Sequence, residues 1–113
     1  ARKIVEAGCA VALATDCYPG SSPTDSMPTF LARATAEMGL TIEEALTAAT
    51  LTAAAAIGRA SELGSIEEGK RADLAILSGA SYHHLVYHYG VNPIRHVVKS
   101  GKVVVKDGIR VSR

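Results

Sequence analysis

The sequence has almost no excess charge, because twelve basic and eleven acidic residues leave a formal net charge of +1 over 113 residues. It therefore lacks the electrostatic footprint of a protein that binds nucleic acid or an anionic membrane. It also lacks an apolar run near the roughly 18–20 residues that span a bilayer, and its start shows no signal peptide. The chain begins Ala-Arg-Lys instead of with Met. We expect one domain or part of one, and a fragment or a processed chain.

Cysteine is scarce, and the two present, Cys9 and Cys17, flank a short apolar run. If residues 10–16 form a strand, the two cysteines lie roughly 26 Å apart. A disulfide tolerates a Cα separation of only about 7 Å. The strand interpretation therefore excludes an intrachain disulfide and favours a reducing, cytoplasmic setting.

The first sixty residues predict an α/β repeat. Residues 1–8 resemble the last turns of a helix that ends at a glycine, and residues 9–14 (CAVALA) are typical of a strand buried on both faces. A polar loop follows, and a helix is expected from Pro28 to Gly39. A second helix is expected over 41–58, because Thr41 begins a capping box and a glycine ends it.

The last fifty residues predict antiparallel β-structure. The segment 64–77 contains turns followed by an apolar strand, and the segment from Arg95 contains Ser-Gly and Asp-Gly turns between apolar runs, which indicate hairpins. The stretch SYHHLVYHYG could be a short helix or an irregular crossover. The composition changes near residues 58–64, and we therefore divide the chain into 1–60 and 61–113.

Asp16 poses the main functional question, because it directly follows the buried apolar run. A carboxylate at such a place must be paired or must bind a metal. Polar residues at the carboxyl ends of parallel strands build the active sites of barrels and open sheets. An aspartate can also cap a loop by accepting backbone N–H groups. The local sequence leaves both interpretations open.

Other polar residues carry weaker signals. His84 and His88 have the i, i+4 spacing of metal ligands on a helix, but no suitable acid or third ligand lies near them, which favours surface histidines. Ser21 and Ser22 have no neighbouring histidine, so a serine nucleophile is disfavoured. The stretch Lys70-Arg71-Ala-Asp is expected to serve a turn and a strand start.

Several motifs resemble one enzyme family over nearly the whole chain. They are ALATDCYPGSSPTDSMP, GLTIEEALTAATLTAAAAIG, GSIEEGKRADLAIL and YHHLVYHYGVNPIRHVVKSGKVV. Together they are similar to the C-terminal portion of the imidazolonepropionases, which belong to the metal-dependent amidohydrolase superfamily. The GSIEEGKRADL stretch indicates only the superfamily. The loop after Asp16 and the Tyr-His-Tyr-Gly-Val-Asn segment are more specific, and they indicate the imidazolonepropionases.

This resemblance implies the last strand-helix part of a (β/α)8 TIM-like barrel, followed by C-terminal strands of a small β-sandwich. It implies that Asp16 binds a catalytic zinc or iron and handles the proton of the attacking water. It further implies that residue 18, Gly20 and Ser21 contact the substrate. The reaction implied is hydrolysis of the ring C–N bond of 4-imidazolone-5-propanoate to N-formimidoyl-L-glutamate in histidine degradation.

The chain departs from the family's motif at one position, and it corresponds to only part of the length of a family member. Tyr18 stands where the family usually carries Asn, and the family's other metal ligands have no counterpart here. We therefore expect the isolated chain to be inactive and to need the remainder of the barrel as its partner, with a homodimer left open. The alternatives are another amidohydrolase, such as a deaminase or a cyclic amidase, or a non-catalytic fragment.

Overall fold

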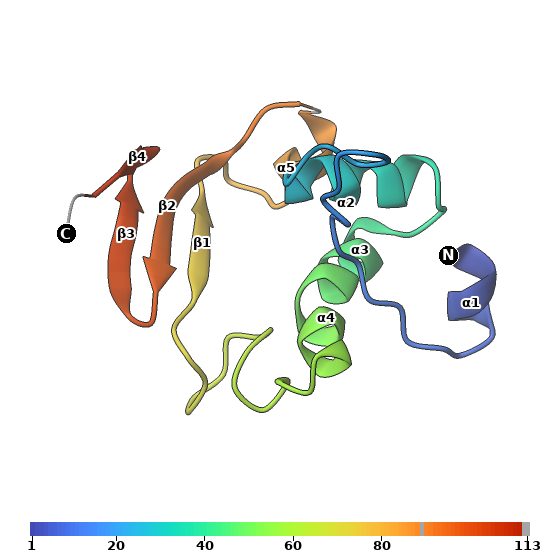
Figure 1. Cartoon of the computed structure of the whole chain (residues 1–113). Helices are drawn as coiled ribbons and strands as arrows, with labels where there is room; N and C mark the ends of the chain where they lie inside the picture. The colour runs from blue at the N-terminus through green and yellow to red at the C-terminus, as the bar shows by residue number, and fades with distance from the viewer. Residues whose placement is uncertain (89, 112–113) are drawn as a thin grey trace.

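A computed structural model describes residues 1–88 and 90–111 of the chain (Figure 1). A helical part and a sheet lie at opposite sides of the molecule, and a short helix stands in the connection between them. The helices are α1 (Arg2–Glu6), α2 (Met27–Ala36), α3 (Ile42–Ala49), α4 (Leu51–Ala56) and α5 (His84–Tyr87). The strands are β1 (Leu74–Leu77), β2 (Ile94–Lys99), β3 (Lys102–Lys106) and β4 (Ile109–Arg110). Among the described residues, no helix combines the length and hydrophobicity needed to cross a membrane.

The hydrophobic core lies entirely in the helical part. Leu31 and Ala34 of α2 meet Ala45 of α3 and the buried Leu40 that joins these helices. Half-buried side chains from α1, from the segment after it and from α5 pack around this cluster. The alanines are required because small side chains let two helices approach closely, and Ala34 and Ala45 are both fully buried.

One acidic side chain ties α1 to α3. The guanidinium of Arg2 donates two hydrogen bonds to Glu44, at 2.8 and 2.9 Å. Glu44 also accepts the backbone N–H of Thr41 at 2.8 Å, and the Thr41 hydroxyl accepts the N–H of Glu44, which confirms the expected capping box. The hydrogen bond from Arg2 is the main reason that the pKa of Glu44 is lowered.

The strand expected over 9–14 is not formed. Residues 9–15 are irregular, and the described residues include no neighbouring strand beside them. Two backbone hydrogen bonds hold the segment instead, from Cys9 N to Ile4 O at 3.1 Å and from Leu13 N to Ala48 O at 2.9 Å, and the Leu13 side chain packs on the core. A strand needs partners for its backbone groups, and an apolar run alone does not supply them.

The single helix expected over 41–58 is two helices. The break is at Thr50, whose backbone adopts φ −120° and ψ −86°. Its hydroxyl donates to Leu46 O at 2.7 Å, a contact that competes with helical hydrogen bonding. Gly64 packs directly against this break, because a Cβ atom there would lie 2.8 Å from Leu51 Cα and from Thr50 O. The break therefore provides the space in which the following loop crosses.

The C-terminal part is a four-stranded antiparallel sheet of order β1-β2-β3-β4. The Ser100-Gly101 and Asp107-Gly108 turns both have two residues with positive φ, as tight hairpin turns require, which confirms the hairpin prediction. Asp73 accepts the N–H of Ser100 at 2.7 Å and pairs with the ammonium group of Lys99. Asp73 therefore serves a turn, the one between β2 and β3. The contact with Lys99 is the main cause of the lowered pKa of Asp73.

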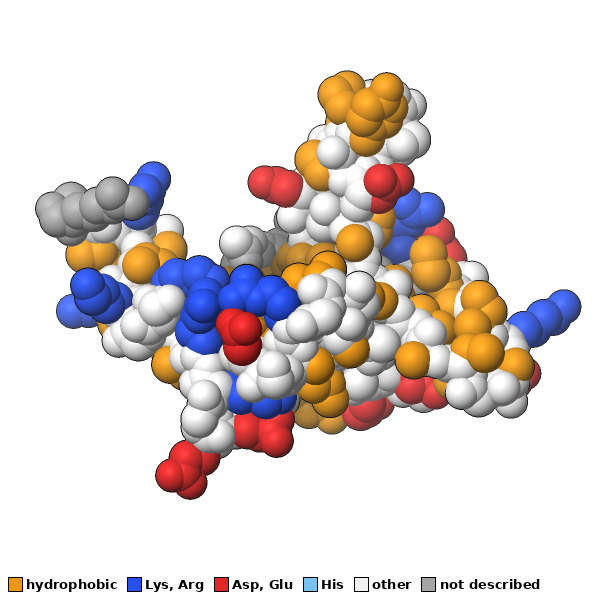
Figure 2. All heavy atoms as spheres, turned by 60° about the horizontal axis from the view of Figure 1, so that its bottom comes forward, with side chains coloured by type: hydrophobic (Ala, Val, Ile, Leu, Met, Phe, Trp, Pro, Cys, Tyr) orange, Lys and Arg blue, Asp and Glu red, His pale blue; other side chains and the backbone are white. Residues whose placement is uncertain are grey.

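The sheet has no buried core of its own. None of the residues in β1 to β4 is buried, and Ile76, Val103 and Ile109 are exposed. Figure 2 shows hydrophobic side chains on the surface both over the sheet and over the helical end of the molecule. The helical part is therefore packed around a core, whereas the sheet of the described chain is open.

Candidate functional site

Asp16 lies at the end of the 9–15 segment with its side chain exposed. Its backbone has φ +47°, in the left-handed region that Asp and Asn enter more readily than other residues with side chains. None of the described residues donates a hydrogen bond to its carboxylate. The carboxylate oxygens are therefore free to bind a ligand. They do not cap the described loop by accepting its backbone N–H groups.

The loop after Asp16 folds back on itself. Tyr18 and Ser22 exchange two backbone hydrogen bonds of 2.9 Å, and Ser21 N lies 3.3 Å from Tyr18 O. The Ser22 hydroxyl donates to Thr15 O at 2.9 Å. These bonds hold the loop tip next to the residue that precedes Asp16. The structure thus brings the four expected site residues into one short loop, where all of them are exposed.

Within this loop, the ring of Tyr18 lies against Gly20. A Cβ atom built on Gly20 would be 2.7 Å from Tyr18 Cε1 and 3.3 Å from Cδ1. Tyr18 as a whole residue is 63% exposed, so this contact leaves most of it open to solvent. The sequence identified both residues but did not predict this contact, because nothing in the spacing shows which way a side chain turns in an irregular loop.

The described residues do not form a metal site by themselves. They contain no group of three or more His, Cys, Asp or Glu side chains that could hold one ion. A catalytic zinc needs about three protein ligands. Asp16 can supply one of them, and the others would have to come from outside the described residues.

The histidine pair in the connection has a packing role. The rings of His84 and His88 are stacked, with centroids 5.1 Å apart and an interplanar angle of 15°. His84 also lies against Gly79, where a Cβ atom would be 2.6 Å from His84 Cδ2. Nitrogen lone pairs lie in the ring planes, so two parallel rings do not direct them at one ion. The geometry agrees with the expectation that this pair is not a metal site.

We expect the double variant His84→Ala/His88→Ala to bind added Zn²⁺ as weakly as the parent chain in a calorimetric titration. Loss of the stacked rings should lower the melting temperature by about 2–4 °C, since packing around α5 is removed. His83→Ala, which changes an exposed histidine at the end of the same helix, is the matched control and should melt within about 1 °C of the parent. A clear loss of zinc affinity in the double variant would show that the pair is a metal site.

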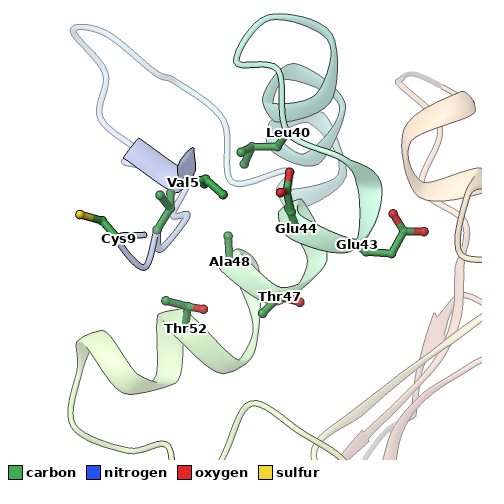
Figure 3. Close-up of a pocket in the computed structure, with 9 residues that line it drawn as sticks. Val5, Cys9, Leu40, Glu43, Glu44, Thr47, Ala48 and Thr52 are labelled. Atoms are coloured by element: carbon green, nitrogen blue, oxygen red, sulfur yellow. The ribbon is translucent and has the colours of Figure 1, made fainter. Parts of the chain in front are cut away.

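A cavity of about 290 Å³ lies between α1, the segment after it and α3 (Figure 3). Apolar side chains, among them Val5, Leu40 and Ala48, make up much of its lining. Glu44 at its edge is already engaged by Arg2, and Glu43 turns away toward α5, where it accepts the Tyr82 hydroxyl at 2.8 Å. None of the residues of the Asp16 loop lines this cavity, so we do not assign the site to it.

The fold and the loop define the class to which this protein belongs. A family model described as the amidohydrolase family matches residues 1–104. The chain belongs to the amidohydrolase family.

Its curated relatives indicate a particular member of that family. The chain is 56% identical over 108 residues to an imidazolonepropionase of Geobacillus sp. (strain WCH70), covering 96% of this chain and 26% of the relative. It is 55% identical over 104 residues to an imidazolonepropionase of Porphyromonas gingivalis (strain ATCC 33277), covering 92% of this chain and 25% of the relative. The chain therefore spans about a quarter of the length of these relatives.

Solved structures confirm the fold class. An amidohydrolase from Thermotoga maritima MSB8 matches 93% of this chain and 25% of its own, with a TM-score of 0.75 and 28% identity. A mutant of atrazine chlorohydrolase TrzN from Arthrobacter aurescens TC1, complexed with zinc and atraton, matches 99% of this chain and 28% of its own, with a TM-score of 0.78 and 27% identity. The chain thus shares its fold with about a quarter of the length of each of these structures.

Proposed function

We propose that this chain supplies the C-terminal part of an imidazolonepropionase, which hydrolyses the ring C–N bond of 4-imidazolone-5-propanoate to N-formimidoyl-L-glutamate in histidine degradation. The supporting observation is the identity of 55–56% to imidazolonepropionases across nearly the whole chain. The alignment spans the region that contains Asp16 and its loop. The 113-residue chain alone has no catalytic activity in this proposal, because it carries only one of the metal ligands.

Asp16 is the proposed catalytic residue and metal ligand. Its carboxylate is exposed and accepts no hydrogen bond from the described residues, so it can bind a cation and accept a proton. A divalent cation, zinc or iron, supplies Lewis acidity when bound. The chain's own contribution is then to take a proton from the attacking water and to return it to the nitrogen that leaves the ring. The zinc found with the Arthrobacter enzyme supports a divalent metal.

The loop residues are the proposed substrate contacts. Ser21 is exposed at the loop tip and can donate its hydroxyl to a ring amide or to the carboxylate of the substrate. Gly20 lets the backbone come close to the ligand, and the exposed ring and hydroxyl of Tyr18 stand beside it. All three are held by the same backbone bonds that close the loop.

The remaining assignments follow from the same proposal. Residues 1–60 belong to the C-terminal part of the barrel, and residues 61–113 provide returning strands of a composite β-sandwich. The exposed apolar residues of the described strands support a sheet that is covered in the complete enzyme. The partners are the small-molecule substrate and the remainder of the barrel, with a homodimer left open. We place the enzyme in the cytoplasm. Cys9 and Cys17 are both free, which agrees with a reducing compartment.

A different amidohydrolase reaction is the second candidate, and Tyr18 is the observation that favours it. Tyrosine offers one hydroxyl where an Asn offers both a donor and an acceptor. A site that loses such a paired contact can discriminate strongly against the original substrate. The Arthrobacter atrazine chlorohydrolase shows that a similar architecture acts on another nitrogen ring compound.

Kinetics of a complete amidohydrolase that contains this chain decide between the two candidates. We expect measurable kcat/KM on 4-imidazolone-5-propanoate, and we expect Tyr18→Asn to change that value by about tenfold or less, because one loop contact is exchanged for another. A panel of other cyclic amides and aminated rings serves as the comparison. The substrate assignment would be rejected if the parent did not turn over imidazolone propionate while the Tyr18→Asn variant did. It would also be rejected if the parent turned over another ring compound instead. Either outcome would retain only the reaction class.

A further inference from the structure

A hydrogen bond between distant residues ties the connection that leads to the sheet to α3. The Tyr82 hydroxyl donates to Glu43 Oε1 at 2.8 Å, across 39 residues of sequence. This bond is the main reason that the pKa of the Glu43 carboxyl is lowered, and it also raises the pKa of the Tyr82 hydroxyl. A carboxylate acceptor makes such a bond stronger than one between neutral groups. We call this hydrogen-bonded pair the strap.

The helix that follows the strap packs on the core of the helical part. Leu85 and Val86 of α5 lie against the buried cluster that α2 and α3 form. α5 itself lies against α2 (Figure 1). The connection is therefore bonded to α3 at Tyr82 and packed on α2 through α5, so that it holds both helices.

α3 also holds the segment that leads to Asp16. Leu13 lies three residues before Asp16, donates its N–H to Ala48 O of α3 at 2.9 Å and packs its side chain on the same core. At the other end of α3, the neighbouring side chains of Glu43 and Glu44 point in different directions, to the connection and toward α1 (Figure 3). The helix thus contacts three parts of the chain, and the position of Asp16 depends on the position of α3.

We propose that Tyr82 and Glu43 are positioning residues for Asp16, because the strap holds α3 and α3 holds the segment that presents the Asp16 carboxylate. The inference rests on the proposed function for the catalytic role of Asp16, but the coupling between the strap and the segment does not. It assigns a role to the stretch SYHHLVYHYG, which the sequence analysis left as a short helix or an irregular crossover. Both residues act through α3 and contact no reacting atom.

Hydrogen exchange of backbone amides in a complete amidohydrolase that contains this chain tests the coupling without any substrate. Tyr82→Phe removes only the hydroxyl of the strap. We expect the Leu13 amide to exchange about three- to tenfold faster in this variant, because a loosened α3 opens the bond to Ala48 O more often. The Cys9 amide, which is bonded to Ile4 O of α1, is the internal reference and should change less than about twofold. Unchanged exchange at Leu13 would overturn the proposal.

Two substitutions of Glu43 separate the strap from the charge of its carboxylate. Glu43→Gln keeps an oxygen that accepts the Tyr82 hydroxyl, whereas Glu43→Ala removes it. Both remove a negative charge from the first turn of α3, where such a charge stabilises a helix. Leu13 exchange should stay within about twofold of the parent in Glu43→Gln and should match Tyr82→Phe in Glu43→Ala, with no further effect when the last two are combined. Equally fast exchange in the Gln and Ala variants would reject the strap.

Tyr87→Phe is the matched control on the same helix. Tyr87 is 80% exposed, and its hydroxyl has no hydrogen-bond partner among the described residues. The control removes the same atom as Tyr82→Phe from the same connection. It should leave Leu13 exchange at the parent value. An acceleration equal to that of Tyr82→Phe would show a general effect of altering the connection and would count against the proposal.

Kinetics of the same variants separate this inference from the proposed function. Tyr82→Phe should lower kcat by about two- to fivefold and leave KM and metal content within about twofold of the parent, because a displaced Asp16 affects the chemical step while the loop contacts remain. Faster Leu13 exchange with unchanged kcat would reject the positioning role. If another ring compound proves to be the substrate, kcat is measured on that compound, and a fall in kcat then supports the inference while the substrate assignment is rejected.

Discussion

Asp16→Asn in a complete amidohydrolase that contains this chain is expected to lower kcat by about a thousandfold, the scale of a lost acid-base group. The asparagine amide is neutral, is a weaker metal ligand than a carboxylate and does not accept a proton. The backbone should not change, since Asn tolerates the left-handed conformation with φ +47° about as well as Asp does. Steady-state kinetics and metal content per protein chain are the measurements.

Asp25→Asn is the matched control for this variant. Asp25 is also exposed and lies nine residues further along the same polar segment, so the control removes an identical charge. We expect its kcat and metal content to stay close to the parent values. If Asp16→Asn retained near-parent activity with its metal, Asp16 would have no catalytic role and the proposed chemistry would be wrong.

Gly64→Ala is expected to give the largest loss of stability among substitutions of a single hydrogen by a methyl group. The glycine has φ +92°, and the added Cβ atom would lie 2.8 Å from Leu51 Cα and 2.9 Å from Ala54 Cβ. Backbone atoms of a packed helix do not move aside as a flexible side chain does. Strain from the positive φ and overpacking together cost about 3 kcal/mol, which urea unfolding of the chain would measure.

Gly69→Ala separates the two causes. Gly69 also has a positive φ, +86°, but nothing lies within 4 Å of the position that an added Cβ atom would take. This control should cost only the backbone strain, about 1–2 kcal/mol. Equal losses for the two variants would show that the contact between Gly64 and the α3–α4 break contributes nothing to stability.

Local patterns were sufficient wherever the interaction that forms an element lies within a few residues. The capping box of Thr41 and Glu44 requires a spacing of three residues, and both of its bonds are present. The Ser100-Gly101 and Asp107-Gly108 turns need positive φ at adjacent positions, which glycine adopts readily and aspartate more readily than most residues with side chains. The glycine stop after α2 is of the same kind, with φ +71° at Gly39.

The secondary-structure predictions were wrong where an element depends on residues far away in the sequence. The apolar run at 9–14 has the composition of a buried strand, but strand formation requires a neighbouring ladder that the described chain does not contain. Periodicity over 41–58 could not reveal the break at Thr50, because the contact with Gly64 comes from a loop that only the tertiary fold brings there.

For the candidate site, the residues themselves were identifiable, and their arrangement was not. Neighbouring residue types are enough to show that Asp16 follows an apolar run, that a small polar loop comes next and that these motifs resemble one amidohydrolase family. The three-dimensional fold was needed to show that the Asp16 carboxylate is free, that His84 and His88 are stacked and that Tyr18 lies against Gly20. Side-chain direction in irregular segments depends on steric contacts and hydrogen bonds in three dimensions, and no sequence periodicity encodes these.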